Sequence, residues 1–164
     1  MKTNPGTTAF PFPTITIDID KLLYFSATCM ARGFTYDLGA KIPLGKDPAT
    51  MPHGTPVDCS GYDRAAIFWA SGVDIGDGSW HQHEVIKAAG FKASTASAGN
   101  LSDGAVRIAF LTPEQGGGIG HVMVIYMGST VESHGHHGPD RRLWGSQFFM
   151  SECAVFVLTP PCAA

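Results

Sequence analysis

The chain has 164 residues, a mass of 17.4 kDa and a formal net charge of −3, which together predict one domain with its own core. The small negative charge and a pI of about 6.1 leave no basic excess for a phosphate backbone, so we expect no nucleic-acid partner. No apolar stretch approaches the ~20 residues of a membrane-spanning helix, and we expect no membrane contact. We also expect a monomer. The unusual feature is the presence of seven His and 20 Gly in a chain that is only 15% charged.

Residues 1–16 are interrupted by prolines and lack the apolar stretch of a secretory signal peptide. The four cysteines are too few for a disulfide scaffold, and none has the C-x-x-C spacing of a zinc or redox site. Cys162 could pair with Cys29 under oxidising conditions, although spacing alone does not establish this pair. We therefore predict a chain without a secretion signal, cofactor or metal.

The order of the predicted elements indicates an α+β fold. In the first part of the chain they are an extended arm over residues 1–17, a helix over 18–32, a loop over 34–57, a helix from 59 to the glycine at 72, and a short helix over 79–89. The predicted strands follow, at 91–94, 105–111, 121–127, 130–134 and 153–158. Helices followed by strands are typical of helices packed on an antiparallel sheet.

The strongest local signal is a cysteine at the start of the predicted second helix, in Val57-Asp58-Cys59-Ser60-Gly61. Free backbone N–H groups and the positive end of the helix dipole favour a thiolate, which makes the sulfur a nucleophile. The alternative is a buried, inert cysteine, which is a common state of this residue type. The flanking aspartate, serine and glycine suit an exposed turn better than a core, and we predict that Cys59 is a nucleophile.

A proton acceptor for this thiol must come from the histidines. His121 follows the glycine-rich run 116–120 and opens an apolar run, a position typical of a side chain held on a rigid strand. Strand alternation places Glu132 and His134 on one face of the next segment, where a polar residue could orient the His121 imidazole. A cysteine, a base and an orienting group are the parts of nucleophilic acyl transfer.

These segments resemble the NlpC-type papain-like cysteine peptidases, a family of cell-wall γ-D-glutamyl endopeptidases. The similarity rests on Asp58-Cys59-Ser60-Gly61-Tyr62 at a helix start, Gly120-His121-Val122 opening a strand, and Tyr36-Asp37-Leu38-Gly39-Ala40 upstream. It covers about residues 22–158. The resemblance implies a papain-like fold in which the helix carrying Cys59 packs against an antiparallel sheet carrying the base.

The resemblance also implies catalytic roles. Cys59 would attack a peptide carbonyl, His121 would transfer the proton, and His134 would orient His121. Two other candidates for the third position are His136, on the same strand face, and Ser133, after a one-residue slip.

For the substrate, the resemblance implies that the Cys59 backbone N–H and the Tyr36 hydroxyl stabilise the oxyanion. Asp58 and Ser60 would hold the free amine of a peptidoglycan stem peptide that begins L-Ala-γ-D-Glu. Arg141 could clamp a substrate carboxylate or lie in a surface turn. The expected activity is hydrolysis of a stem-peptide bond, and the expected setting is a phage lysin, a tail-associated part or a delivered effector.

Two alternatives remain open from the sequence. The same triad could pass the acyl group to an amine, which would make the protein a transpeptidase or amidotransferase. A different class of function is a metal-binding module built from the histidines of residues 134–137 with His121 or Glu132, because imidazole and carboxylate suit zinc.

Overall fold

The structure, a computed structural model, describes residues 14–161. The α-helices in this range are α1 (Ile19–Ala31), α2 (Cys59–Ser71) and α3 (Ser79–Ala88), and the 3₁₀ helices are η1 (Pro48–Thr50), η2 (Ala96–Asn100) and η3 (Phe148–Glu152). The strands are β1 (Ala93–Ser94), β2 (Val106–Leu111), β3 (His121–Tyr126), β4 (Ser129–His134), β5 (Gly138–Asp140) and β6 (Ala154–Thr159). No helix among the described residues is both long and apolar enough to cross a membrane.

The first two helices, α1 and α2, each have an aspartate as the N-cap residue. Asp18 accepts a hydrogen bond from Lys21 N at 3.1 Å, and Asp58 accepts one from Gly61 N at 2.6 Å. Both carboxylates thus satisfy backbone donors that the first helical turn leaves without partners. α2 ends at Gly72, whose φ of 75° is a left-handed conformation that glycine adopts without strain.

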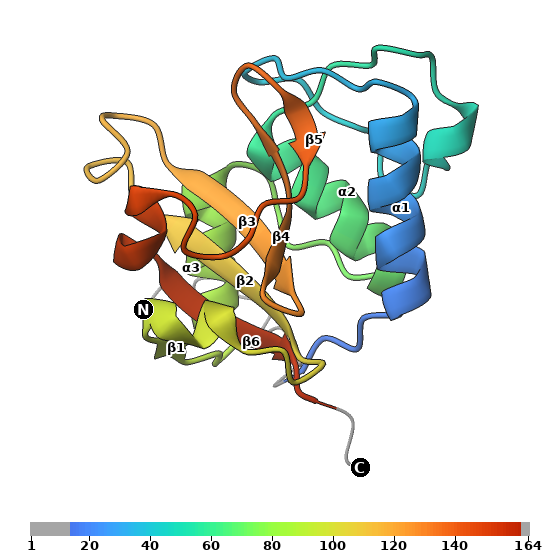
Figure 1. Ribbon diagram of the computed structural model, residues 1–164. Helices are drawn as coiled ribbons and strands as arrows, with labels where there is room; N and C mark the ends of the chain where they lie inside the picture. Colours follow the sequence, from blue (N-terminus) through green and yellow to red (C-terminus); the bar gives the residue numbers. More distant parts are fainter. Residues whose placement is uncertain (1–13, 162–164) are drawn as a thin grey trace, which may run out of the picture.

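The strands form one antiparallel sheet in the order β1-β6-β2-β3-β4-β5 (Figure 1). β3 and β4 are joined by the two-residue turn Met127–Gly128, in which both residues have positive φ. These two strands pair only as far as Val124 opposite Val131, and β4 then pairs with β5. The start of β3, where His121 lies, is therefore outside the β3–β4 ladder.

Both faces of the central strands are buried. Alternate side chains of β2 and β3 join the core that contains α1, α2 and α3 on one face: Ile108, Phe110, Val122 and Val124. The intervening side chains pack on the other face with the segment around η3: Ala109, Leu111, Met123 and Ile125 with Trp144 and Met150. In Figure 1, α2 and α1 lie to one side of the strands and α3 lies behind them.

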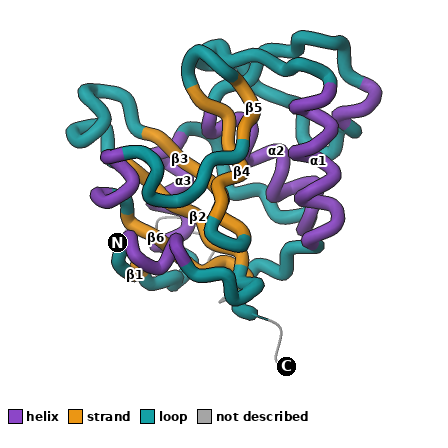
Figure 2. Tube along the Cα trace, in the orientation of Figure 1, coloured by secondary structure: helices purple, strands orange, loops and turns teal. Residues whose placement is uncertain are grey.

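A long loop connects α1 to α2 and contains only η1 as a regular element (Figure 2). The loop folds back on itself, since Thr35 N donates to Thr55 O at 3.1 Å and Val57 N donates to Thr35 O at 2.9 Å. It also contacts the β4–β5 hairpin closely, because a Cβ on Gly138 would lie 2.5 Å from Phe34 O. These contacts hold the start of the loop beside the N-terminus of α2.

The predicted α+β arrangement with an antiparallel sheet is confirmed. β5 was not predicted, since Gly and Pro in Gly138–Asp140 are depleted in strands. Residues 14–17 form no strand, but Ile15 N donates to Leu158 O at 3.0 Å. The rest of the predicted arm and the predicted partner of Cys29, Cys162, lie outside the described residues.

Candidate active site

Cys59 is the first residue of α2 and is 5% exposed. Burial and the neighbouring Asp58 carboxylate raise its pKa above the usual value, while the backbone N–H groups of Val122 and Ser60 and the Lys41 ammonium act in the opposite direction. The expectation of a resting thiolate is therefore corrected: the helix terminus does not outweigh burial and the adjacent negative charge. Cys59 is a thiol that needs a base.

Two residues connect Cys59 to the strand that carries His121. Val122, whose backbone N–H acts on the sulfur, directly follows His121 in β3. Tyr36 is close enough to Cys59 for the sulfur to raise the pKa of its hydroxyl, and its side chain lines the same groove as His121. Burial, the most important cause, and the neighbouring sulfur raise the pKa of Tyr36 to about 12, so the hydroxyl keeps its proton at neutral pH. Val122 and Tyr36 thus link Cys59 to the strand and the groove of His121, and the catalytic roles of Cys59, His121 and Tyr36 stay predictions.

The orienting partner of His121 is Glu132. His121 Nε2 lies 2.7 Å from Glu132 Oε2, and the glutamate side chain is fully buried. Thr130 Oγ1 donates to Glu132 Oε1 at 2.6 Å, and Arg142 donates to both oxygens at 2.8 and 2.7 Å. Burial alone would raise the pKa of Glu132, but the hydrogen bonds from His121 and Arg142 outweigh it and lower that pKa to about 2. Glu132 is therefore a carboxylate that can hold Nε2 protonated and leave Nδ1 as the acceptor.

His134, the predicted orienting residue, does not contact His121 in this way. Its Nε2 lies 3.2 Å from Asp140 Oδ2, across the β4–β5 pair. The reason is that β3 and β4 stop pairing after Val131, and the end of β4 pairs with β5 instead. Glu132 and His134 lie on the same face of β4, but it is Glu132 that lies opposite the His121 imidazole. The other candidates also lie elsewhere: His136 is exposed in the turn, and Ser133 Oγ donates to Val57 O.

A groove of about 450 Å³ opens over His121. It is lined by Tyr36, Leu111, Gln115, Gly116, Ile119, Gly120, His121, His134, Gly135, Arg142 and Phe149. The glycine-rich segment before β3 thus forms one wall of the groove, and the β4–β5 turn contributes His134 and Gly135. None of the lining side chains is a carboxylate.

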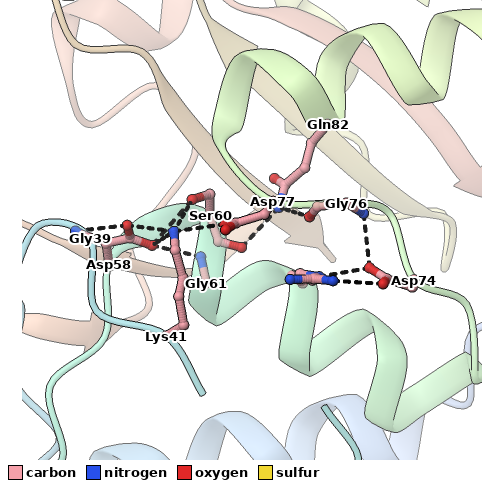
Figure 3. A network of polar contacts seen from close by, with 10 residues as sticks. Gly39, Lys41, Asp58, Ser60, Gly61, Asp74, Gly76, Asp77 and Gln82 are labelled. Carbon is pink, nitrogen blue, oxygen red and sulfur yellow. Dashed lines mark hydrogen bonds and ion pairs between the residues drawn. The ribbon is translucent and has the colours of Figure 1, made fainter. Parts of the chain in front are cut away.

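Asp58 and Ser60, predicted to hold a substrate amine, are instead engaged by Lys41 (Figure 3). Lys41 Nζ lies 2.7 and 2.9 Å from the two Asp58 oxygens and 2.9 Å from Ser60 Oγ. Asp58 Oδ2 also accepts from Gly39 N at 3.0 Å. Asp58 thus caps α2 and holds the preceding loop, and the role of Asp58 and Ser60 in binding a substrate amine stays a prediction.

Arg141 does not line the groove and is exposed, whereas its neighbour Arg142 contacts Glu132. Sequence reasoning missed Arg142 and Lys41, and it placed Glu132 on the right strand face but chose His134 as the partner of His121. Strand alternation predicted that Glu132 and His134 lie on the same face. The two adjacent arginines, Arg141 and Arg142, marked a cationic segment, but the sequence does not reveal which of them contacts the site. Nothing in the sequence indicated Lys41, because its partner lies 17 residues away.

The described residues contain no group of three or more His, Cys, Asp or Glu side chains that could hold a metal ion. The alternative metal-binding module therefore has no support from residues 14–161. In the comparisons, no known protein-family model and no curated protein matches the sequence.

Proposed function

We propose that the protein is a cysteine peptidase or amidase in which Cys59, His121 and Glu132 form the catalytic set. The observation that carries this proposal is the 2.7 Å contact between His121 Nε2 and the buried Glu132 carboxylate, with Cys59 at the N-terminus of α2 near the backbone N–H of Val122, the residue that follows His121. This is the arrangement of nucleophile, base and orienting group that acyl transfer requires. The order of these residues on a helix and then on two strands supports the NlpC-type resemblance.

The first half of the reaction forms a thioester. His121 Nδ1 accepts the Cys59 proton as the sulfur bonds to the carbonyl carbon of the scissile amide, and Glu132 stabilises the imidazolium that results. The oxyanion accepts hydrogen bonds from the Cys59 backbone N–H and the Tyr36 hydroxyl. When the carbon–nitrogen bond breaks, the imidazolium gives its proton to the leaving amine.

The second half regenerates the thiol. His121 Nδ1 accepts a proton from water as the oxygen attacks the thioester carbonyl, and the carbon–sulfur bond then breaks. The proton on the imidazole passes to the departing sulfur, and the product leaves as a carboxylic acid. Since Cys59 rests as a thiol, proton transfer to His121 belongs to the attack itself.

The substrate class that we propose is the peptide stem of peptidoglycan, which follows from the family resemblance. The test is to incubate purified cell wall with the wild type and with Cys59→Ala, and to measure released amines and the masses of soluble fragments. We expect the variant to release at most ~10⁻³ of the wild-type amount while its circular dichroism is unchanged. Equal release by the two proteins would refute the proposal.

A further inference from the structure

The side chain of Lys41 lies beside the nucleophile with its ammonium shared among three residues. Besides Asp58 and Ser60, Lys41 Nζ lies 2.9 Å from Asp77 Oδ1, and Figure 3 shows these oxygens converging on the nitrogen. The hydrogen bonds to Asp58 and Asp77 outweigh the effect of partial burial and raise the pKa of Lys41, so the group stays charged at neutral pH. This ammonium is close enough to Cys59 to act against the rise in the pKa of the thiol.

The backbone leaves room for this lysine. A Cβ on Gly61 would lie 2.7 Å from Lys41 Cδ and 2.9 Å from Ala40 O, so only glycine lets the lysine stem cross the first turn of α2. On the far side of that turn, Gln82 Nε2 donates to Ser60 O at 2.9 Å and attaches α3 to the same turn. The position of the ammonium is thus fixed by the fold, even though the Lys41 side chain is 31% exposed.

Lys41 and neighbouring donors occupy both oxygens of Asp58, the carboxylate that precedes the nucleophile. The Asp58 oxygens accept hydrogen bonds from two backbone N–H groups, from Ser60 and from Lys41, and the side chain is only 6% exposed. The other carboxylate of the site, Glu132, is occupied by His121 and Arg142. A third carboxyl near Cys59, that of Asp63, is fully buried, and burial raises its pKa well above the usual value, which favours the neutral form. A substrate ammonium brought next to Cys59 would therefore meet a like charge and, among the described residues, no accessible carboxylate without a partner, which costs free energy once water is excluded.

We propose that Lys41 takes the place of a substrate ammonium, so that the enzyme selects peptides whose amino group near the cleaved bond is already acylated. This inference rests on the proposed peptidase function and names its substrate class. An acylated nitrogen is neutral and needs no carboxylate partner. For a stem peptide, the amine of L-Ala is acylated as long as the stem remains attached to its glycan. The enzyme would therefore act on the attached stem and would need no earlier amidase reaction to release it.

The experiment compares two peptides, L-Ala-γ-D-Glu-diamino acid with a free N-terminus and the same peptide N-acetylated. We expect wild-type kcat/KM to be at least ~10-fold higher for the acetylated peptide, the scale of one unpaired polar group in a closed site. Lys41→Met keeps the stem and removes the charge, and it is expected to reverse the preference because Asp58 becomes free. Lys46→Met, a change of an exposed lysine in the same loop, should leave the ratio unchanged.

The outcomes separate this inference from the proposed function. A wild type that cleaves both peptides and prefers the free amine would overturn the role of Lys41 and leave the peptidase proposal intact. If wild type cleaves neither and Cys59→Ala binds neither by calorimetry, both proposals fail. Should Lys41→Met not fold, Asp77→Asn retains the Lys41–Asp58 pair and must keep the preference for the acetylated peptide; loss of that preference would contradict the inference.

Discussion

Glu132→Gln is the substitution that most directly tests how His121 is oriented. Glutamine has nearly the shape of glutamate, but it carries no charge and presents an NH₂ group in place of one of the two oxygens that accept hydrogen bonds here. Glu132 accepts from His121, Thr130 and Arg142 and is fully buried. The variant therefore leaves Arg142 without its counter-ion and forces either a lost hydrogen bond or a reversed imidazole tautomer.

The structure allows the size of two effects of Glu132→Gln to be estimated, one on stability and one on kcat. A pKa lowered from 4.5 to about 2 corresponds to ~3 kcal/mol of stabilisation by the ionised carboxylate at neutral pH, at ~1.4 kcal/mol per unit. A wrong tautomer of the base costs ~10⁴ in kcat in a serine protease triad, and we expect a loss of ~10²–10⁴ for Glu132→Gln. The KM for the substrate should change little, because Glu132 does not line the groove.

The pH dependence gives a separate measurement. Because the folded-state pKa of Glu132 is lowered, its stabilisation is fully present above the unfolded-state value near 4.5 and is lost as pH falls toward 2. The difference in unfolding free energy between wild type and Glu132→Gln should therefore be largest at pH 7 and shrink between pH 4.5 and 2. Urea unfolding monitored by tryptophan fluorescence measures this difference.

His134→Ala is the matched control, because His134 lines the same groove but bonds Asp140 instead of His121. We expect it to lower kcat by no more than ~10-fold. If His134→Ala loses as much activity as Cys59→Ala while Glu132→Gln keeps it, the assignment of the orienting group from this geometry is wrong. Nitrogen chemical shifts of His121 report its tautomer even if no substrate has been found.

Three other changes follow from the local geometry. Gly61→Ala should destabilise the fold by ~1–3 kcal/mol, because the added Cβ would collide with Lys41 and Ala40 O. The control Gly135→Ala, whose Cβ would have no atom within 4 Å, should change the unfolding free energy by less than ~0.5 kcal/mol. Equal losses of unfolding free energy in the two variants would contradict the close approach at Gly61. Burial raises the pKa of Asp63 well above its usual value, so the contribution of Asp63 to wild-type stability should fall as pH rises above ~4. In urea titrations, the unfolding free energy of Asp63→Asn should therefore increase relative to that of wild type between pH 4 and 7. A constant difference between the two would contradict this. Tyr36→Phe should lower kcat by ~10²–10³ in the same peptide assay if the hydroxyl stabilises the oxyanion, and an unchanged kcat would exclude that role.

The helices could be predicted from the sequence because their signals are local. Asp18 and Asp58 lie directly before apolar periodicity, and Gly72 lies directly after it. β5 could not be predicted from its own residues, and the backbone of residues 34–35 that lies against Gly138 is distant in the sequence. Such a contact between distant segments leaves little trace in composition or periodicity.

For the site, the sequence located candidate residues on regular elements, but it did not reveal the contacts that the strand register sets. Cys59 and His121 are at the ends of a helix and a strand, where motif and structure coincide. The choice between Glu132 and His134 depends on where β4 leaves β3, which neither residue type nor alternation reveals. Strand alternation limited the candidate partners of His121 to one face of this strand, and the strand register then identified Glu132 as the residue that contacts it.

The groove is assembled from segments that are far apart in the chain, with Tyr36 before α2, His121 at the start of β3, and Arg142 after β5. During synthesis, the thiol emerges many residues before Arg142, the cation that pairs with the Glu132 carboxylate. A chain truncated before Arg142 would contain Cys59, His121 and Glu132 without the arginine that pairs with the buried carboxylate. Proteolysis or premature termination in this last part of the chain should therefore abolish turnover even where α1 and α2 survive.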